Sequence, residues 1–250
     1  HQYYQAHVTQ PLLLAQLHDW GIDLSAGQLN HLLTEGHDAF HQEKAELKAA
    51  GLATSPYLQA DDTGARHQGR NGYCTYIGNE RFAWFASTDS KSRVNFLELL
   101  QADRCYEINA EALAYMAERG LAAGHCERLA AHPVVLTEAD AWTTHLRRHL
   151  IDSPRAVALA TEGALIGGLA AQGFNLDIGL VSDDAGQFDL FVHGLCWVHA
   201  ERPLSHLVPL NESDRRAIAW VRQQVWFLYR DLKAYRQAPD PAAKARITAG

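Results

Sequence analysis

The sequence predicts an α/β fold with helices at its N-terminal end and a large helical segment in its middle. The spacing of apolar residues changes from the helical to the extended pattern near residue 57, and the extended pattern returns near residue 178. The segments with strand character are 57–61, 72–77, 81–86, 178–182 and 194–198. We therefore divide the chain into a helical N-terminal region, residues 1–51, and an α/β region, residues 52–250, with a helical insertion at about 104–173.

The N-terminal region has the signals of consecutive helices. A leucine-rich helix ends at Gly21, and Ser25 with Gln28 three residues later forms a capping-box pattern before the next apolar run. A third helix, residues 38–50, is rich in charge and is expected to end at Gly51. Two short helices around a glycine turn outline a helix-turn-helix, although any helical hairpin gives the same pattern.

The last long helix is predicted over residues 213–236. Its apolar residues are spaced alternately by three and four positions, at Ile218, Val221, Val225, Leu228, Leu232 and Tyr235. Because this stripe covers only about two and a half heptads, we expect a helix laid on its own domain rather than a coiled-coil dimer. Pro239 and Pro241 end it.

Composition limits the possible classes of protein. No apolar run is long enough to cross a membrane, and the four cysteines form no Cys-x-x-Cys pair, which favours a cytoplasmic location. The chain begins with His1 rather than Met, which suggests a piece of a longer protein. The net charge of −7 argues against binding of DNA through bulk charge, although net charge does not describe local charge.

Acidic pairs follow two of the predicted strands. Asp61 and Asp62 come directly after residues 57–60, and Asp183 and Asp184 come directly after residues 178–182. Carboxylates brought together at strand ends suit a hard divalent cation such as Mg²⁺. An aspartate after a strand is more often a turn former, and a separation along the chain gives no distance in space.

Two stretches carry a resemblance to a known family. YLQADDTGARHQGRNGYCTYIGNERFAWFASTDSKSRVNFLELL, from Tyr57, resembles the strand and hairpin of bacterial insertion-sequence transposases of the insertion sequence 66 type, which belong to the DDE superfamily. LVSDDAGQF and the following HGLCWVHAERPLSHL resemble that family's second strand and a Cys-Trp-x-His-x-x-Arg stretch. The resemblance implies a ribonuclease-H-like core that uses Mg²⁺ or Mn²⁺.

The resemblance assigns the catalytic, metal-binding carboxylates to Asp61 and Asp183. Asp62 and Asp184 are the alternatives, since Asp184 stands where the family has glycine. The family's third carboxylate is a glutamate in an Asn-x-x-x-Glu-Arg-like segment near the C-terminus. Glu212 lacks that motif around it, so we expect a chain truncated before its third catalytic acid and inactive or very weak as it stands.

Basic residues near both motifs are candidates for contacts with DNA phosphates. They are Arg66, Arg70, Lys91, Arg93 and Arg202, and a solvated charged face is an equally good interpretation. Cys196 and His199 are half of a zinc site without a visible second half, so a buried cysteine beside a hydrogen-bonded histidine is expected instead. His145 and His149 are expected to be surface histidines.

The implied function is transposition. Water and then a DNA 3′-hydroxyl would attack phosphodiesters in line, without a covalent protein intermediate. The expected partners are the transposon ends and target DNA, with a homo-oligomer in the intact enzyme and no membrane. The alternatives are a ribonuclease-H-like nuclease and an inactive fragment that only binds DNA or self-associates.

Overall fold

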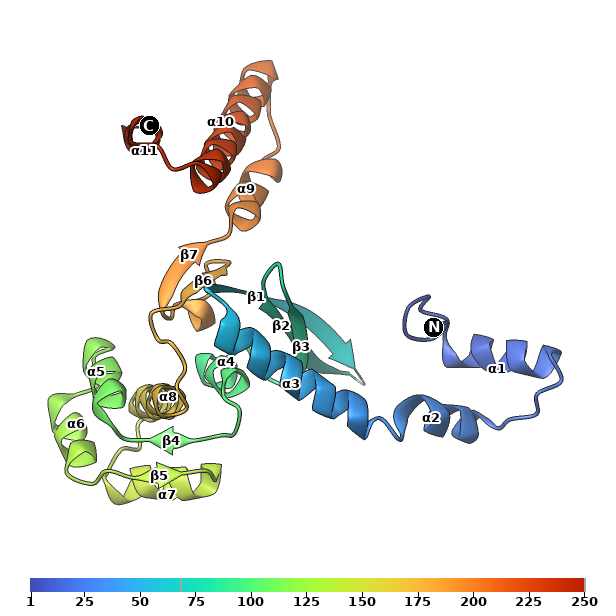
Figure 1. Cartoon of the computed structure of the whole chain (residues 1–250), viewed down its shortest axis with the longest axis horizontal. Helices are drawn as coiled ribbons and strands as arrows, with labels where there is room; N and C mark the ends of the chain where they lie inside the picture. The colour runs from blue at the N-terminus through green and yellow to red at the C-terminus, as the bar shows by residue number, and fades with distance from the viewer. Residues whose placement is uncertain (68, 250) are drawn as a thin grey trace. The chain divides into compact units, whose positions relative to one another are not determined.

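The computed structural model describes residues 1–67 and 69–249, and its elements are labelled in Figure 1. The chain divides into two compact units, His1–Ala50 and Gly51–Gly250. The first unit holds helices, and the second holds a mixed sheet with the helices that pack on it. The predicted α/β class is confirmed.

The first unit contains α1 (Gln10–Asp19), α2 (Ala26–Thr34) and the first part of α3 (Asp38–Thr54). The predicted capping box is confirmed, because the Gln28 N–H donates to the Ser25 hydroxyl and the Ser25 N–H donates to the Gln28 side chain. Gly21 after α1 has a φ of 78°, which suits a residue without a side chain. The helical N-terminal prediction therefore holds at the level of its elements.

Helix α3 does not end at Gly51, as its sequence suggested, but continues to Thr54. Gly51 is buried inside the helix, and a Cβ at that position would lie 2.6 Å from the ring of Phe82. The glycine is used for close approach to an aromatic ring rather than to stop the helix.

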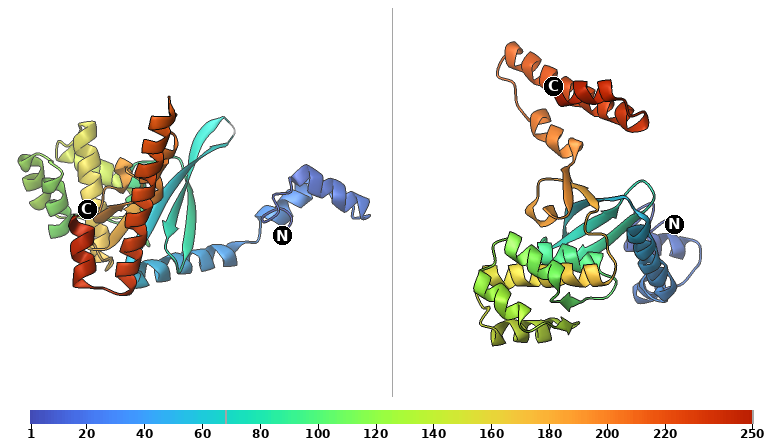
Figure 2. Two further views of the ribbon diagram at one scale, coloured as in Figure 1. Left: turned by 90° about the horizontal axis from the view of Figure 1, so that it is seen from above. Right: turned by 60° about the vertical axis from the view of Figure 1, so that its left-hand side comes forward.

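Among the described residues, five strands form one mixed sheet in the order β3-β2-β1-β6-β7. Figure 2 gives two further views of the chain that contains this sheet. β1 (Tyr57–His67) pairs antiparallel with β2 (Arg70–Gly78), which pairs antiparallel with β3 (Ala83–Thr88). On its other side β1 runs parallel to β6 (Gly179–Ser182), and β6 runs parallel to β7 (Val192–Leu195). The hairpin and the two later strands therefore extend the sheet in opposite directions from β1.

The first strand is longer than predicted. Asp61 and Asp62 do not follow β1 but lie inside it, because the pairing with β2 continues from Gln59 to His67. The parallel pairing with β6, by contrast, ends at Gln59. Asp61 thus lies just beyond the residues of β1 that pair with β6, in the part of β1 that pairs only with β2.

One face of the sheet is buried and the other is more open. Side chains alternate along β1, so that Leu58 and Ala60 are buried while Gln59 is exposed and Asp61 is half-buried. The buried face contacts α4 (Arg93–Leu100), whose Phe96 packs edge-to-face on Phe188 at 5.0 Å between ring centroids. This packing leaves the face that carries Asp61 free of the main core.

The helical middle of the chain consists of α5 (Ala110–Glu118), α6 (Ala123–Ala130), α7 (Ala139–Arg148) and α8 (Pro154–Ala171). A short pairing of β4 (Tyr106–Glu107) with β5 (Val135–Leu136) was not predicted. α8 packs against α4, α5 and β4, and its buried residues belong to the same core as the sheet. The predicted insertion therefore shares its core with the α/β region.

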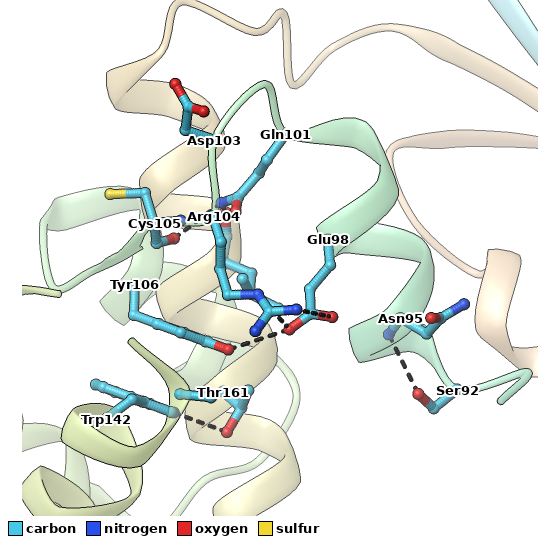
Figure 3. A network of polar contacts seen from close by, with 12 residues as sticks. Ser92, Asn95, Glu98, Gln101, Asp103, Arg104, Cys105, Tyr106, Trp142 and Thr161 are labelled. Carbon is cyan, nitrogen blue, oxygen red and sulfur yellow. Dashed lines mark hydrogen bonds and ion pairs between the residues drawn. The ribbon is translucent and has the colours of Figure 1, made fainter. Parts of the chain in front are cut away.

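Polar contacts fix the link between α4 and β4, as Figure 3 shows. The buried Gln101 amide accepts from the Cys105 N–H and donates to the Cys105 carbonyl, both at 2.9 Å. The Tyr106 hydroxyl donates to Glu98 at 3.1 Å, and Arg104 pairs with the same carboxylate at 3.2 Å. Burial and the nearby Glu98 raise the pKa of Tyr106 to about 12. The tyrosine is therefore a neutral donor that holds this connection.

After β6 the chain forms a 3-10 turn, η1 (Gly186–Phe188), then β7, α9 (Trp197–Ser205), α10 (Glu212–Gln237) and α11 (Pro241–Ala249). The predicted long helix is confirmed, but its expected packing along the domain is wrong. None of the residues of α10 is buried, and Trp220 is 62% exposed. The described part of α10 contacts chiefly α9 and α11.

The hydropathy of the helices bears on a membrane location. None of the helices in the described ranges is long and apolar enough to cross a bilayer. The four cysteines are free and half-buried.

Candidate functional site

Three side chains from separate elements meet at the end of the sheet where the parallel pairing of β1 with β6 stops. Asp61 lies in β1, Asp183 directly follows β6, and His199 lies in the first turn of α9. One potential ligand atom of each residue lies within 4.8 Å of those of the other two, and all three side chains are half-buried. We refer to these three residues as the Asp-Asp-His group.

The strand register explains why these residues meet. Tyr57 pairs with Gly179 and Gln59 with Val181, so the same register continued by two residues places Asp183 beside Asp61. β6 ends at this point, and the chain returns through β7 on its other side. Strand pairing therefore brings together two carboxylates that are far apart in the sequence.

The start of α9 is tied to the same edge. The Cys196 N–H donates to the Ser182 carbonyl at 2.7 Å, which extends the pairing of β6 with β7 to the residue before α9. His199 follows three residues later and turns back to the carboxylates. The position of the imidazole is thus set by the sheet as well as by the helix.

Each carboxylate of the group has a local hydrogen bond. One oxygen of Asp61 accepts from the Asp62 N–H at 2.9 Å, and one oxygen of Asp183 accepts from the Ala185 N–H at 3.2 Å. The Nδ1 atom of His199 is buried and has no hydrogen-bond partner among the described residues. A buried ring nitrogen without a partner is costly, and a metal ion or a water molecule would satisfy it.

The electrostatics of the group favour a cation. Two ionised carboxylates within 4.8 Å of each other repel by about 3 kcal/mol or more at an effective dielectric constant of about 20. A divalent cation between them would convert this repulsion into attraction. Carboxylate oxygens suit Mg²⁺ and Mn²⁺, and the imidazole nitrogen shifts the preference from Mg²⁺ toward Mn²⁺ and other transition metals.

The alternative acids lie elsewhere. Asp62 points to the opposite face of β1 from Asp61, where it accepts hydrogen bonds from the Thr75 hydroxyl at 2.5 Å and from Gln187 at 3.0 Å. Asp184 is exposed and is not part of the Asp-Asp-His group. The geometry therefore favours Asp61 and Asp183 over their neighbours.

The predicted phosphate-binding residues do not form one surface. Arg66, on the side of Asp62, and Lys91, which lies 5.2 Å from the centroid of the Tyr73 ring, are both exposed. Arg70 is exposed on the side of Asp61, toward the far end of the hairpin. Arg202 is exposed and stands one helical turn from His199 on α9.

Arg93 has other partners. Its guanidinium donates to Glu162 at 3.1 Å and to the backbone oxygen of Gly186, and it lies 3.8 Å from Asp189. Its side chain is 18% exposed. Because its charge is already paired inside the fold, Arg93 is a structural residue in this arrangement and is poorly placed to contact DNA.

The histidines differ from their expected roles. His199 was expected to be hydrogen-bonded, but its Nδ1 has no such partner in the described chain and its ring faces two carboxylates. His145 is half-buried rather than on the surface, and its ring lies 4.6 Å from that of His149. Sequence reasoning missed His199 as a companion of the carboxylates, although its place shortly after the strand at 192–195 was a usable signal.

The fold and the site define a mixed α/β protein with a candidate divalent-metal group. A protein of Sinorhizobium fredii (strain NBRC 101917 / NGR234), described as uncharacterized protein y4jO, is 38% identical over 200 residues. The match covers 78% of this chain and 62% of that protein, so the chain spans less than two thirds of its relative's length. No protein-family model matches the sequence, and no solved structure matches the chain.

Proposed function

We propose that this chain is part of the catalytic core of a DNA transposase, in which Asp61 and Asp183 hold a divalent metal ion at the scissile phosphodiester. The observation that carries the proposal is the convergence of these two carboxylates, from strands far apart in the sequence, with His199 beside them. The reaction class is metal-dependent phosphoryl transfer.

The sheet supports a ribonuclease-H-like core. A long first strand pairs with an antiparallel hairpin on one side and with two later parallel strands on the other. This is the arrangement that we expect of such a core, in which the first acid lies on the central strand and the second follows the next parallel strand. Asp61 and Asp183 occupy these two positions.

Each residue of the site has a defined task in this proposal. Asp61 and Asp183 supply oxygen ligands, and His199 supplies a nitrogen ligand. A bound Mg²⁺ or Mn²⁺ supplies Lewis-acid activation of the attacking oxygen and stabilises charge on the leaving oxygen. Arg202, one turn further along α9, would hold a neighbouring phosphate.

The net charge of −7 means that affinity for DNA must come from local features. Exposed cations on the side of the site include Arg70 on β2 and Arg202 on α9. The match covers 62% of the longer relative. We include in the proposal that DNA is also bound by a part of the protein that corresponds to the unmatched remainder of that relative. A homo-oligomer and a cytoplasmic location belong to the same proposal.

The first experiment is titration of the chain with Mn²⁺ by calorimetry. We expect binding that Asp61→Asn and Asp183→Asn each weaken at least about tenfold, because each removes a charged ligand. Asp184→Asn is the matched control, since it removes the same charge from the adjacent exposed position. If Asp184→Asn weakens binding as much as Asp183→Asn, or if the wild-type chain does not bind Mn²⁺, the proposed site is wrong.

Assays of DNA nicking and joining distinguish the transposase from two alternative functions. The ribonuclease-H-like nuclease is favoured if metal-dependent nicking of DNA occurs without joining of a transposon end to target DNA. The inactive binding fragment is favoured if DNA is bound but neither nicked nor joined. The long uncovered helix α10 supports self-association in that case, because its apolar residues are exposed.

A further inference from the structure

A row of side chains crosses the open face of the sheet in line with the Asp-Asp-His group. Asp61 pairs directly with Tyr76 on β2, and Tyr76 pairs directly with Phe85 on β3. Directly paired residues in antiparallel strands point to the same face. Phe85, Tyr76, Asp61 and Asp183 therefore follow one another across four neighbouring strands.

The two aromatic residues form a surface that the fold leaves uncovered. The Phe85 side chain is 52% exposed, and Tyr76 is half-buried. Their ring centroids are 5.4 Å apart. An exposed phenylalanine in the middle of a strand buries little apolar area, so its position is not explained by the stability of the core.

The ring of Tyr76 lies along the sheet rather than standing away from it. A Cβ added to Gly78, two residues further on β2, would lie 2.7 Å from the Tyr76 hydroxyl oxygen and 2.9 Å from its ring. The absence of a side chain at Gly78 thus makes room for the ring. The edge and hydroxyl of the Tyr76 ring therefore lie close to Gly78.

We propose that Phe85 and Tyr76 form a stacking surface for an unpaired nucleotide of the DNA strand whose phosphate is held by Asp61 and Asp183. The inference rests on the proposed function of the Asp-Asp-His group. Neighbouring strands are about 5 Å apart, so the backbone positions of Tyr76 and Phe85 lie about 5 and 10 Å from that of Asp61 along the row. A nucleotide separates its phosphate from its base by a distance on this scale.

The chemistry selects an unpaired base rather than a duplex. Inside a double helix both faces of a base are covered by its neighbours, so a flat aromatic surface can stack only on a base that has left the helix or lies at a frayed end. Stacking on aromatic side chains is tolerant of sequence because every base has a π face. The site would therefore take strand ends and distorted junctions in preference to continuous duplex.

The test compares binding of a short single-stranded DNA with binding of the blunt duplex of the same sequence, both in the presence of Mn²⁺. The probe carries 2-aminopurine, whose fluorescence falls when the base stacks. The test variant is Phe85→Leu, which keeps an apolar residue at the exposed position. Phe227→Leu is the matched control, because Phe227 is a partly exposed phenylalanine on α10, away from the row.

We expect tighter binding of the single strand than of the duplex, quenching of the probe, and a loss of at least about fivefold in affinity in Phe85→Leu. Mn²⁺ binding by Phe85→Leu should equal that of the wild-type chain, since the phenylalanine contacts no ligand. Unchanged affinity in Phe85→Leu, an equal loss in Phe227→Leu, or a preference for duplex would overturn the inference. Failure of Mn²⁺ binding in the wild-type chain refutes the proposed function separately, because it is measured without DNA.

Discussion

The glycine pair Gly167-Gly168 of α8 gives a quantitative test of the packing. In the sequence the pair lacks the strand-to-helix setting of a phosphate-binding loop, and in the structure it lies against the backbone next to β4. A Cβ at Gly168 would lie 2.7 Å from the Gln101 side chain and 3.0 Å from the Cys105 carbonyl carbon, and closer still to the Cys105 oxygen. The pair therefore lets the helix approach the backbone directly.

The magnitude for Gly168→Ala follows from two opposing terms. Inserting a methyl group into a packed interior costs about 1 to 3 kcal/mol, and backbone neighbours that cannot rotate away place this site at the upper end. Replacing glycine by alanine inside a helix contributes about 1 kcal/mol in the opposite direction. The expected net loss is about 2 kcal/mol, which lowers Tm by about 4 to 8 °C in a unit of this size.

The assay is thermal unfolding followed by circular dichroism. Gly124→Ala in α6 is the control, because a Cβ there meets only the end of the Arg128 side chain at 4.0 Å. That variant should have a Tm equal to or slightly above the wild-type value. A Gly168→Ala variant as stable as Gly124→Ala would refute the close approach of α8 to the Cys105 backbone.

Two further predictions concern buried and titrating groups. Glu162→Gln should lower the free energy of unfolding by about 2 kcal/mol in urea denaturation, because one Glu162 oxygen accepts from both Arg93 at 3.1 Å and Tyr115 at 2.8 Å; an unchanged unfolding midpoint would show that this carboxylate is not shared. Burial, and then the neighbouring His149, lower the pKa of His145 below its ordinary 6.5. As pH falls, His145 therefore takes up a proton in the unfolded chain at a higher pH than in the folded chain. The free energy of unfolding then decreases as pH falls below about 6.5. His145→Gln should reduce the fall of Tm between about pH 7 and 5.5, and a fall identical to that of the wild-type chain would contradict the assignment.

The sequence predicted those elements that local signals define. The capping box at Ser25 and the apolar runs before Asp183 need no information from distant parts of the chain, and both were found in place. The continuation of β1 through Asp61 and Asp62 was missed because the residues there are polar on both faces. Only pairing with β2 holds them extended, and pairing is a long-range property.

Two other features depend on tertiary contacts in the same way. Gly51 is a stop signal in isolation, yet the ring of Phe82 packs where its side chain would be and the helix continues. His199 joins the carboxylates only because β7 directs the chain back along the sheet edge before α9 begins. The two acids could be identified from the sequence. The place of His199 shortly after a strand was a signal, but it did not show that the histidine lies beside these acids.

The central position of β1 has a consequence for the order of folding. Its partner β2 follows at once in the chain, whereas β6 begins at Gly179 after the whole helical middle. Closing the longer loop costs more entropy, so the hairpin can form early and the parallel pairing must form late. Asp61 is then in place before Asp183 and His199 arrive. Uptake of Mn²⁺ during refolding should therefore lag behind the gain of hairpin structure and mark the step at which the sheet is completed.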